Sequence, residues 1–451
     1  MPASEVLDVS RLIDERKLSA FNLKLLVLCF LAVLFDGYDI GAVAFAGPYL
    51  IKEWSITSMA DLGPVIAASL AGIVVGSPVF GYVGDRFGRK AAIIGSMVAF
   101  GIFTLAAVKA GGVRDLLYLR FLAGIGLGGL MPNVNALTAE FSPRRIRATM
   151  IIVMFSGITI GGAVPGVVSA SLAPEYGWQI LFYIGGIAPL LLAIVLAAAL
   201  PESIKFLVLK TERRGEILAT LLRLVPGGQF RGDARIVIGE EAAAHAGFRP
   251  SMLFAGYLKW MTPLLWLLFV CDLLSFNFIF GWTPIVLSQA QVSRETAALA
   301  TSVFQIGGTI GGLALARPID KFGVMPVSLS FMAAMPIVGA IGFLAWSAPL
   351  LLGILFLAGF CLIGILFALN ALSALVYPTA IRSNGSGWAL GVGRFGSAAG
   401  PIIGGYLIDM KLSPTQLFMT LLVPLGIGTL ASIFATRIYY GARMRGPAVA
   451  D

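Results

Sequence analysis

The stretch Gly81-Tyr-Val-Gly-Asp-Arg-Phe-Gly-Arg-Lys90 is a short charged interruption between two long apolar runs. Its centre, Asp85-Arg-Phe-Gly88, returns 235 residues later as Asp320-Lys-Phe-Gly323, again between two apolar runs. Other residues repeat at a spacing of 235 or 236: Pro143 with Pro378, Arg147 with Arg382, Asp36 with Asp272, and Pro48 with Pro284. A repeat that keeps its register along the chain predicts two duplicated halves.

Twelve apolar runs fill most of the 451 residues, of which 58% are hydrophobic and only 12% charged. A soluble domain carries roughly 25% charged residues, and about 20 apolar residues let a helix cross a bilayer. The runs are too long for strands and do not alternate. They cover 22–46, 61–83, 90–109, 113–138, 149–173, 177–200, 259–290, 296–317, 324–346, 349–372, 383–408 and 414–440. We therefore predict an all-α membrane protein, with twelve transmembrane helices in two pseudo-symmetric six-helix bundles within a lipid bilayer.

The basic residues predict the orientation of these helices. With both termini in the cytoplasm, 25 of the 32 Lys and Arg residues lie on the cytoplasmic side and five lie outside. This asymmetry is typical of membrane proteins, and it accounts for the net charge of +9 without a nucleic-acid partner. We expect a monomer in a bacterial inner membrane. The expected parts are a cytoplasmic tail (1–21), a bundle (22–200), a cytoplasmic linker (201–258), a second bundle (259–440) and a cytoplasmic tail (441–451).

Cysteine and histidine usage predicts neither a metal site nor a cofactor. Cys29, Cys271 and Cys361 lie in separate apolar runs, without the paired spacing of a zinc site or a disulfide framework. His245 is the single histidine and falls in the polar central stretch, where a solvated loop residue is expected. We find no nucleophile–base pair and no phosphate-binding glycine loop after a strand, so an enzyme is not expected.

Several motifs resemble the major facilitator superfamily over essentially the whole chain. The 81–90 stretch is similar to the signature loop of that family, and the 320–323 copy lies where the family has a second one. Arg120-Phe-Leu-Ala-Gly-Ile-Gly126 resembles its helix 4 motif. Glu140-Phe-Ser-Pro143 with Arg147, and Pro201-Glu-Ser203, resemble the sugar-porter-like and organic-acid branches.

Two further motifs narrow the resemblance to one branch. Asp36-Gly-Tyr-Asp39 is similar to the first-helix element of the aromatic acid:proton symporter family. Gly393-Arg-Phe-Gly396, leading to Gly400-Pro401, also resembles that family. The resemblance implies a secondary active transporter that imports a small organic acid, an aromatic monocarboxylate, together with protons by alternating access.

Five charged residues fall deep inside the predicted helices, away from their ends: Asp36, Asp39, Arg120, Asp272 and Arg394. Such residues are costly in a membrane and usually functional, although a buried Asp–Arg pair can also serve only to lock two helices together. Asp39 and Arg120 lie at matching depth, and Asp36 is one turn deeper on the same face. We expect Asp36 and Asp39 to couple the proton. Arg120, with Arg394 and Asp272, is expected to bind the substrate, because guanidinium pairs bidentately with carboxylate.

Two weaker sets complete the candidate residues. Tyr38, Asn277, Gln305 and Trp388 are candidates for contacting a substrate, although most aromatic side chains in such helices only pack against neighbours or lipid. The interruptions between helices carry glycines and charges at the cytoplasmic surface, which favours a role in gating rather than in substrate contact. The candidate gating residues are Gly81, Asp85, Arg86, Gly88, Arg89, Asp320 and Lys321.

Other functions stay open at this point. Glu140, Pro143, Arg147 and the 201–203 motif would also suit a sugar or polyol proton symporter, but a sugar needs no buried Arg to neutralise it. Drug export by proton antiport is a further alternative. A sensor that binds without transporting is less favoured, because the central stretch contains no recognisable signalling module.

Overall fold

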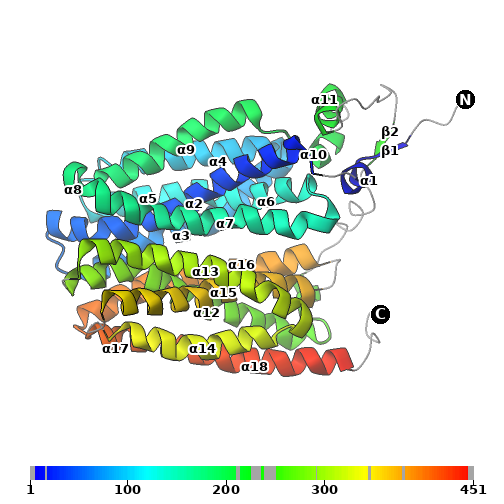
Figure 1. The fold of residues 1–451 in the computed structure, drawn as a ribbon. Helices are drawn as coiled ribbons and strands as arrows, with labels where there is room; N and C mark the ends of the chain where they lie inside the picture. The colour runs from blue at the N-terminus through cyan, green and yellow to red at the C-terminus, as the bar shows by residue number, and fades with distance from the viewer. Residues whose placement is uncertain are drawn as a thin grey trace, which may run out of the picture.

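In the computed structural model the described residues are 6–15, 18–209, 214–224, 235–237, 250–290, 292–343, 347–377 and 381–444. Long helices run side by side, and the described chain begins and ends at one end of the helical body (Figure 1). We call this the terminal end, and the opposite end, where α3 begins at Met59 and α16 finishes at Asp409, the far end.

The first half contains helices from α2 to α9. They are α2 (Ala20–Glu53), α3 (Met59–Phe87), α4 (Arg89–Ala107), α5 (Val113–Gly128), α6 (Leu130–Glu140), α7 (Arg147–Ser171), α8 (Ala173–Tyr176) and α9 (Gln179–Ala199). The side chain of Asn22 accepts a hydrogen bond from the Ser19 N–H at 3.1 Å and so caps the start of α2. Gly129 lies between α5 and α6 in close contact with α3, since a Cβ there would meet the Phe80 Cβ at 2.1 Å.

The second half contains α12 (Leu258–Gln289), α13 (Arg294–Phe322), α14 (Met325–Ile341), α15 (Ala348–Val376), α16 (Arg382–Asp409), α17 (Pro414–Met419) and α18 (Leu422–Met444). In the described parts of both halves, ten helices are long and apolar enough to cross a membrane, with α5–α6 and α17–α18 each counted as one. α14 is shorter, and α16 is long but rich in glycine. Together these are the twelve expected segments, which confirms the predicted helical membrane fold.

Smaller elements lie at the terminal end, outside the two groups of long helices (Figure 1). They are β1 (Val6–Asp8), α1 (Val9–Asp14), η1 (Arg144–Ile146), α10 (Ile204–Leu209), α11 (Arg214–Leu224), β2 (Arg235–Val237) and η4 (Pro250–Phe254). The two strands pair in parallel, with Val6 opposite Arg235. This pair is a small addition to the predicted all-α fold, and it ties the first described residues to the stretch between the halves. The position of His245 lies outside the described residues.

The internal repeat is visible in how the helices cross. Gly72 and Gly76 lie so close to α5 that an added Cβ would come within 2.2 and 2.0 Å of its carbonyl oxygens. Adding 235 to both residue numbers converts each contact of this crossing into one between α13 and α15: Gly72–Phe121 gives Gly307–Phe356, Gly76–Ile125 gives Gly311–Phe360, and Gly124–Ser69 gives Gly359–Phe304. The spacing of 235 residues that relates the sequence motifs therefore also relates the helix contacts. The small residues at these crossings allow the helices to pack closely.

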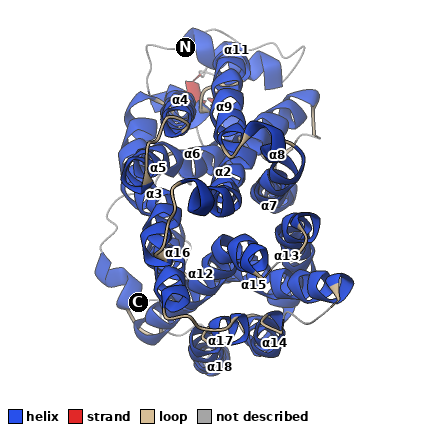
Figure 2. Cartoon of the chain, turned by 90° about the vertical axis from the view of Figure 1, so that its left-hand side faces the viewer, coloured by secondary structure: helices blue, strands red, loops and turns tan. Residues whose placement is uncertain are grey.

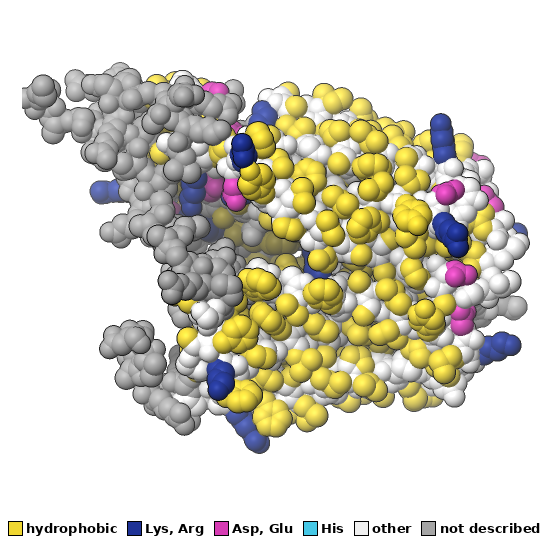
Figure 3. Space-filling model, turned by 180° about the vertical axis from the view of Figure 1, so that it is seen from behind, with side chains coloured by type: hydrophobic (Ala, Val, Ile, Leu, Met, Phe, Trp, Pro, Cys, Tyr) yellow, Lys and Arg dark blue, Asp and Glu magenta, His cyan; other side chains and the backbone are white. Residues whose placement is uncertain are grey.

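The two halves form separate groups that meet along three helix pairs: α3 with α16, α7 with α13, and α2 with α12 (Figure 2). Near the far end these contacts are close, since a Cβ on Gly47 would meet Ile285 at 2.7 Å and one on Gly405 would meet the Met59 carbonyl oxygen at 2.5 Å. Figure 3 shows a face covered mainly by apolar side chains, with charges gathered at its ends and a recess between the halves toward the terminal end.

Candidate functional site

Asp39 and Arg120 meet in the interior of the first half. Both side chains are fully buried, and the Arg120 Nη2 donates hydrogen bonds to the Asp39 carboxylate and, at 2.5 Å, to the Ser69 hydroxyl. The guanidinium also lies 5.7 Å from the centre of the Phe182 ring. Ser69 reaches Arg120 because its backbone is in contact with Gly124 at the close crossing of α3 and α5. The structure thus brings together the two residues whose depths match in the sequence.

Asp36 lies one turn from Asp39 on α2 and is also buried, with 4% of its surface exposed. Among charged residues, Arg394 of α16 in the other half attracts it, while Asp39 repels it. Arg394 is only partly buried, in contrast to Arg120. An attraction between opposite charges, without an ion pair or hydrogen bond among the described residues, therefore crosses the boundary between the two halves.

Asp272, the repeat partner of Asp36, occupies a different environment. It is fully buried, and within the described part of the chain neither of its carboxylate oxygens has a hydrogen-bond partner. Asp272 and Arg394 are both expected to bind the substrate, and in the structure the carboxylate whose charge acts on Arg394 is that of Asp36. The sequence could not distinguish these two carboxylates, because it gives no information about rotation around the helix axis.

The four weaker candidates are found in dissimilar settings. The Tyr38 hydroxyl donates to the Leu181 carbonyl oxygen at 3.0 Å, inside the first half. Asn277 donates to the Leu273 carbonyl oxygen of its own helix at 2.9 Å. Trp388 is 48% exposed and stacks on Trp266 with ring centroids 6.1 Å apart.

Gln305 is the fourth, and it lies where the two halves meet. It is 3% exposed, and its Oε1 has no hydrogen-bond partner among the described residues. Its amide nitrogen is 2.2 Å from where a Cβ on Gly162 would be, so glycine at 162 gives the amide its room.

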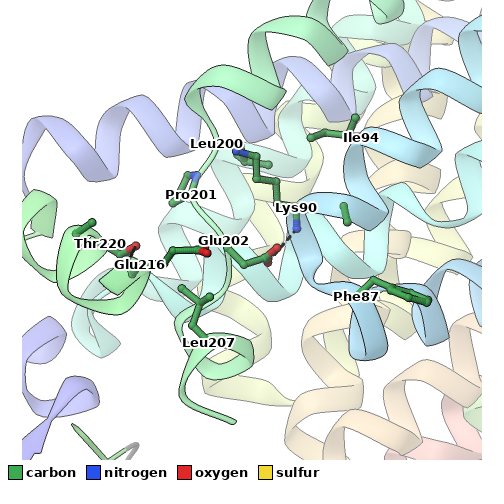
Figure 4. Close-up of a pocket in the computed structure, with 11 residues that line it drawn as sticks. Phe87, Lys90, Ile94, Leu200, Pro201, Glu202, Leu207, Glu216 and Thr220 are labelled. Atoms are coloured by element: carbon green, nitrogen blue, oxygen red, sulfur yellow. Dashed lines mark hydrogen bonds between the residues drawn. The ribbon is translucent and has the colours of Figure 1, made fainter. Parts of the chain in front are cut away.

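The charged loop between α3 and α4 is built around Gly88, which has a φ of +109°. A Cβ there would come 2.2 Å from the Glu202 carboxylate, which accepts a hydrogen bond from the Lys90 N–H at 3.1 Å (Figure 4). Asp85 and Arg89 form an ion pair of 2.6 Å, and Gly81 has open space around it. In the sequence, Glu202 stands out only as part of the Pro201-Glu-Ser203 motif. Its contact with this loop can be recognised only from the fold, because 112 residues separate it from Lys90.

A pocket of about 470 Å³ adjoins this loop and is lined by residues that include Phe87, Lys90, Pro201 and Glu202 (Figure 4). The other loop candidates also lie at the terminal end. Arg86 donates to the Tyr82 hydroxyl at 2.6 Å, and the Lys321 ammonium lies 5.1 Å from the Phe322 ring centre. The side chain of Asp320 is not among those described.

The far end has a contact that the sequence did not point to. The Asp409 carboxylate, at the end of α16, accepts hydrogen bonds from the Ser58 hydroxyl at 2.6 Å, the Met59 N–H at 2.6 Å and the Ala60 N–H at 2.9 Å. A carboxylate from one half thus caps the free N–H groups at the start of α3 in the other half, where the helix dipole favours negative charge. Ser58 is a residue type that is typical of helix caps, so the sequence could indicate where α3 begins. It could not indicate that Asp409 would be the capping partner.

Two duplicated helical halves around buried charges define a secondary-transporter fold, and comparisons with known proteins agree. The sequence profile of the Major Facilitator Superfamily matches residues 29–323 and 264–445. The 4-hydroxybenzoate transporter PcaK of Pseudomonas putida is 36% identical over 429 residues, 95% of each chain. The gallate transporter of Pseudomonas putida is 36% identical over 450 residues, which cover 99% of this chain and 98% of the relative.

A solved structure shares the fold at low sequence identity. The xylose transporter XylE from E. coli, in a partially occluded inward open conformation, gives a TM-score of 0.71 at 18% identity and covers 93% of this chain and 98% of XylE. The chain therefore belongs to the Major Facilitator Superfamily and, within it, to the aromatic acid:proton symporter family. It is a multi-pass membrane transport protein, not an enzyme.

Proposed function

We propose that this protein imports a small aromatic monocarboxylate by proton symport with alternating access. The names of two relatives, transporters of 4-hydroxybenzoate and of gallate, support an aromatic acid as the substrate. The observation that carries the proposal is the attraction between the buried Asp36 and Arg394 of the other half, one turn from the buried pair of Asp39 and Arg120. A cation that can bind an anion and an acid that can bind a proton would thereby influence each other across the boundary.

Arg394 is the better anchor for the substrate carboxylate. Arg120 is fully buried and already donates to Asp39 and Ser69. A substrate would have to break both bonds, and uncovering a buried ion pair costs several kcal/mol. Arg394 is partly exposed and belongs to the other half. We therefore assign the first contact with the carboxylate to Arg394, and to Arg120 the task of holding Asp39 and α2 in place.

The same attraction offers a way to couple the proton. When a substrate carboxylate neutralises Arg394, the ionised Asp36 loses the favourable effect of that positive charge, and a buried carboxylate without a compensating charge is costly. Binding a proton to Asp36 removes that cost, so substrate and proton bind together. When both leave, the positive charge of Arg394 again favours the ionised form of Asp36, and the empty protein can return.

The far-end cap and the recess support one state of an alternating-access cycle. In the proposed orientation both termini and the 201–258 linker are cytoplasmic, so the recess opens inward and the Asp409 cap seals the outer side. The 22–200 and 259–440 bundles would move against each other to reverse this. The loop of Gly81, Asp85, Gly88 and Arg89 would then act as a gate at the inner surface.

Uptake into proteoliposomes tests this proposal. We expect accumulation of labelled 4-hydroxybenzoate when the outside is more acidic than the lumen, and no accumulation of xylose. Arg394→Gln should abolish uptake, whereas Arg317→Gln, a basic residue of α13, should leave it intact. Accumulation that is indifferent to the pH gradient, or uptake that survives the loss of Arg394, would contradict the proposal.

A further inference from the structure

Three phenylalanine rings form a stack beside the boundary between the halves. Phe276 is nearly parallel to Phe280, with ring centroids 5.7 Å apart, and to Phe304, at 6.0 Å. The tip of the Phe280 ring lies 3.5 Å from the point where a Cβ on Gly162 would be, and the Gln305 Nε2 lies 2.2 Å from that same point. One end of the aromatic stack and one amide group therefore lie at a single place.

This place lies nearer the far end of the molecule than Asp36 does. The same Phe280 ring tip also approaches Gly41 of α2, at 3.5 Å from its would-be Cβ. Gly41 is five residues beyond Asp36 on the same helix, which corresponds to about 7.5 Å along the axis. That distance is comparable to a benzene ring with one substituent at each end. A ring whose carboxylate lies at the depth of Asp36 would therefore bring its opposite substituent to the depth of the Phe280 ring tip, where Gly162 and the Gln305 amide also lie.

Gln305 differs from Asn277, the other candidate amide, in whether its polar atoms have hydrogen-bond partners. Asn277 uses its NH₂ group on the Leu273 carbonyl oxygen of its own helix, and neither of its side-chain polar atoms is buried without a partner. The Gln305 Oε1 is buried and has no partner among the described residues. A buried acceptor without a donor costs about 1–3 kcal/mol, which a donor supplied by a ligand would recover.

We propose that the Gln305 carboxamide oxygen accepts a hydrogen bond from a ring hydroxyl of the substrate, so that the site selects hydroxylated aromatic acids. This inference rests on the proposed function, since it takes the carboxylate to be held at Arg394. The Phe276–Phe280–Phe304 stack supplies the apolar surface for the ring. Because Oε1 only accepts, the substituent must donate, and a substituent of similar size without a hydrogen to donate is rejected.

The wild-type protein tests the requirement for a donor without any mutation. We expect 4-hydroxybenzoate and 4-aminobenzoate to compete for uptake at least tenfold more strongly than benzoate and 4-methoxybenzoate, because a site built for a donor rejects analogues that lack it. Benzoate that competes within about threefold of 4-hydroxybenzoate, or 4-methoxybenzoate that competes equally well, would overturn the proposal.

Two variants test whether Gln305 is the acceptor. Gln305→Met keeps the length of the side chain but removes the acceptor, and it should reduce the preference for 4-hydroxybenzoate over benzoate at least tenfold while benzoate uptake persists. Asn277→Leu, the matched loss of a buried amide, should leave the preference unchanged. An unchanged preference in Gln305→Met, or an equal loss in Asn277→Leu, refutes the assignment. Failure of the wild type to accumulate any of these acids would instead refute the proposed function.

Discussion

Asp409→Asn should release the far end of the molecule. In the present state the carboxylate accepts three hydrogen bonds, from the Ser58 hydroxyl and the N–H groups of Met59 and Ala60. Hydrogen bonds to charged groups contribute roughly 1.5–3 kcal/mol each, and a charge at a helix terminus about 0.3–1 kcal/mol. Asparagine retains one neutral acceptor oxygen, so we expect a loss of about 2 kcal/mol, or roughly thirtyfold in the equilibrium between closed and open far ends.

The shift can be measured with a thiol placed in the closed seam. Ile285 is buried against Gly47 from the other half, so a cysteine at 285 becomes accessible only when the far end opens. In an Ile285→Cys background, Asp409→Asn should raise the labelling rate more than tenfold. Asp115→Asn is the matched control, since Asp115 accepts a hydrogen bond from the Gly111 N–H at the same end but within one half. Equal labelling in the parent and Asp409→Asn, or an equal rise in Asp115→Asn, would refute the reasoning.

The remaining predictions concern the helix crossings and the buried charges. Gly76→Ala should lower the thermal midpoint in detergent markedly, because its Cβ would be 2.0 Å from the Ile125 carbonyl oxygen, whereas Gly81→Ala, with open space around it, should not. Asp36→Asn should abolish accumulation driven by a pH gradient yet retain counterflow exchange, which needs no net proton movement; accumulation at the wild-type level would contradict the coupling role. Arg120→Leu should cost about 3–5 kcal/mol of stability by leaving Asp39 unpaired, and Asp39→Ser in the same chain should recover most of it, as judged by thermal unfolding.

The sequence allowed the helices and their repeat to be predicted because both depend on local composition and register. The spacing of 235 reappears in the crossing of Gly72 with Phe121 and of Gly307 with Phe356. Contacts between the halves could not be predicted in this way. That the charge of Arg394 acts on Asp36, rather than on Asp272, depends on how two separate groups of helices pack and on how each helix is rotated.

The contacts that the sequence did not predict were missed for the same reason, because they join residues that are far apart in the sequence. Asp409 has no neighbour in the sequence that identifies it as the cap of a helix 350 residues away. Gln305 was a candidate for its chemistry alone, and only the position of Gly162 beside it shows where its amide lies. An amide without a partner can be recognised only once every neighbour is placed.

The repeat is broken at the buried ion pair, and this limits how the protein can evolve. Shifting Asp39 by 236 gives Ser275, and shifting Arg120 by 235 gives Leu355, so the second half has a neutral pair at the equivalent positions. A single change from either arrangement toward the other leaves one buried charge alone, at a cost close to the whole stability of a marginal fold. Each half thus keeps its own charged or neutral pair, because a substitution at one position of the pair lowers stability unless the other position changes as well. The two descendants of one duplicated unit have become separated by a barrier that single substitutions do not readily cross.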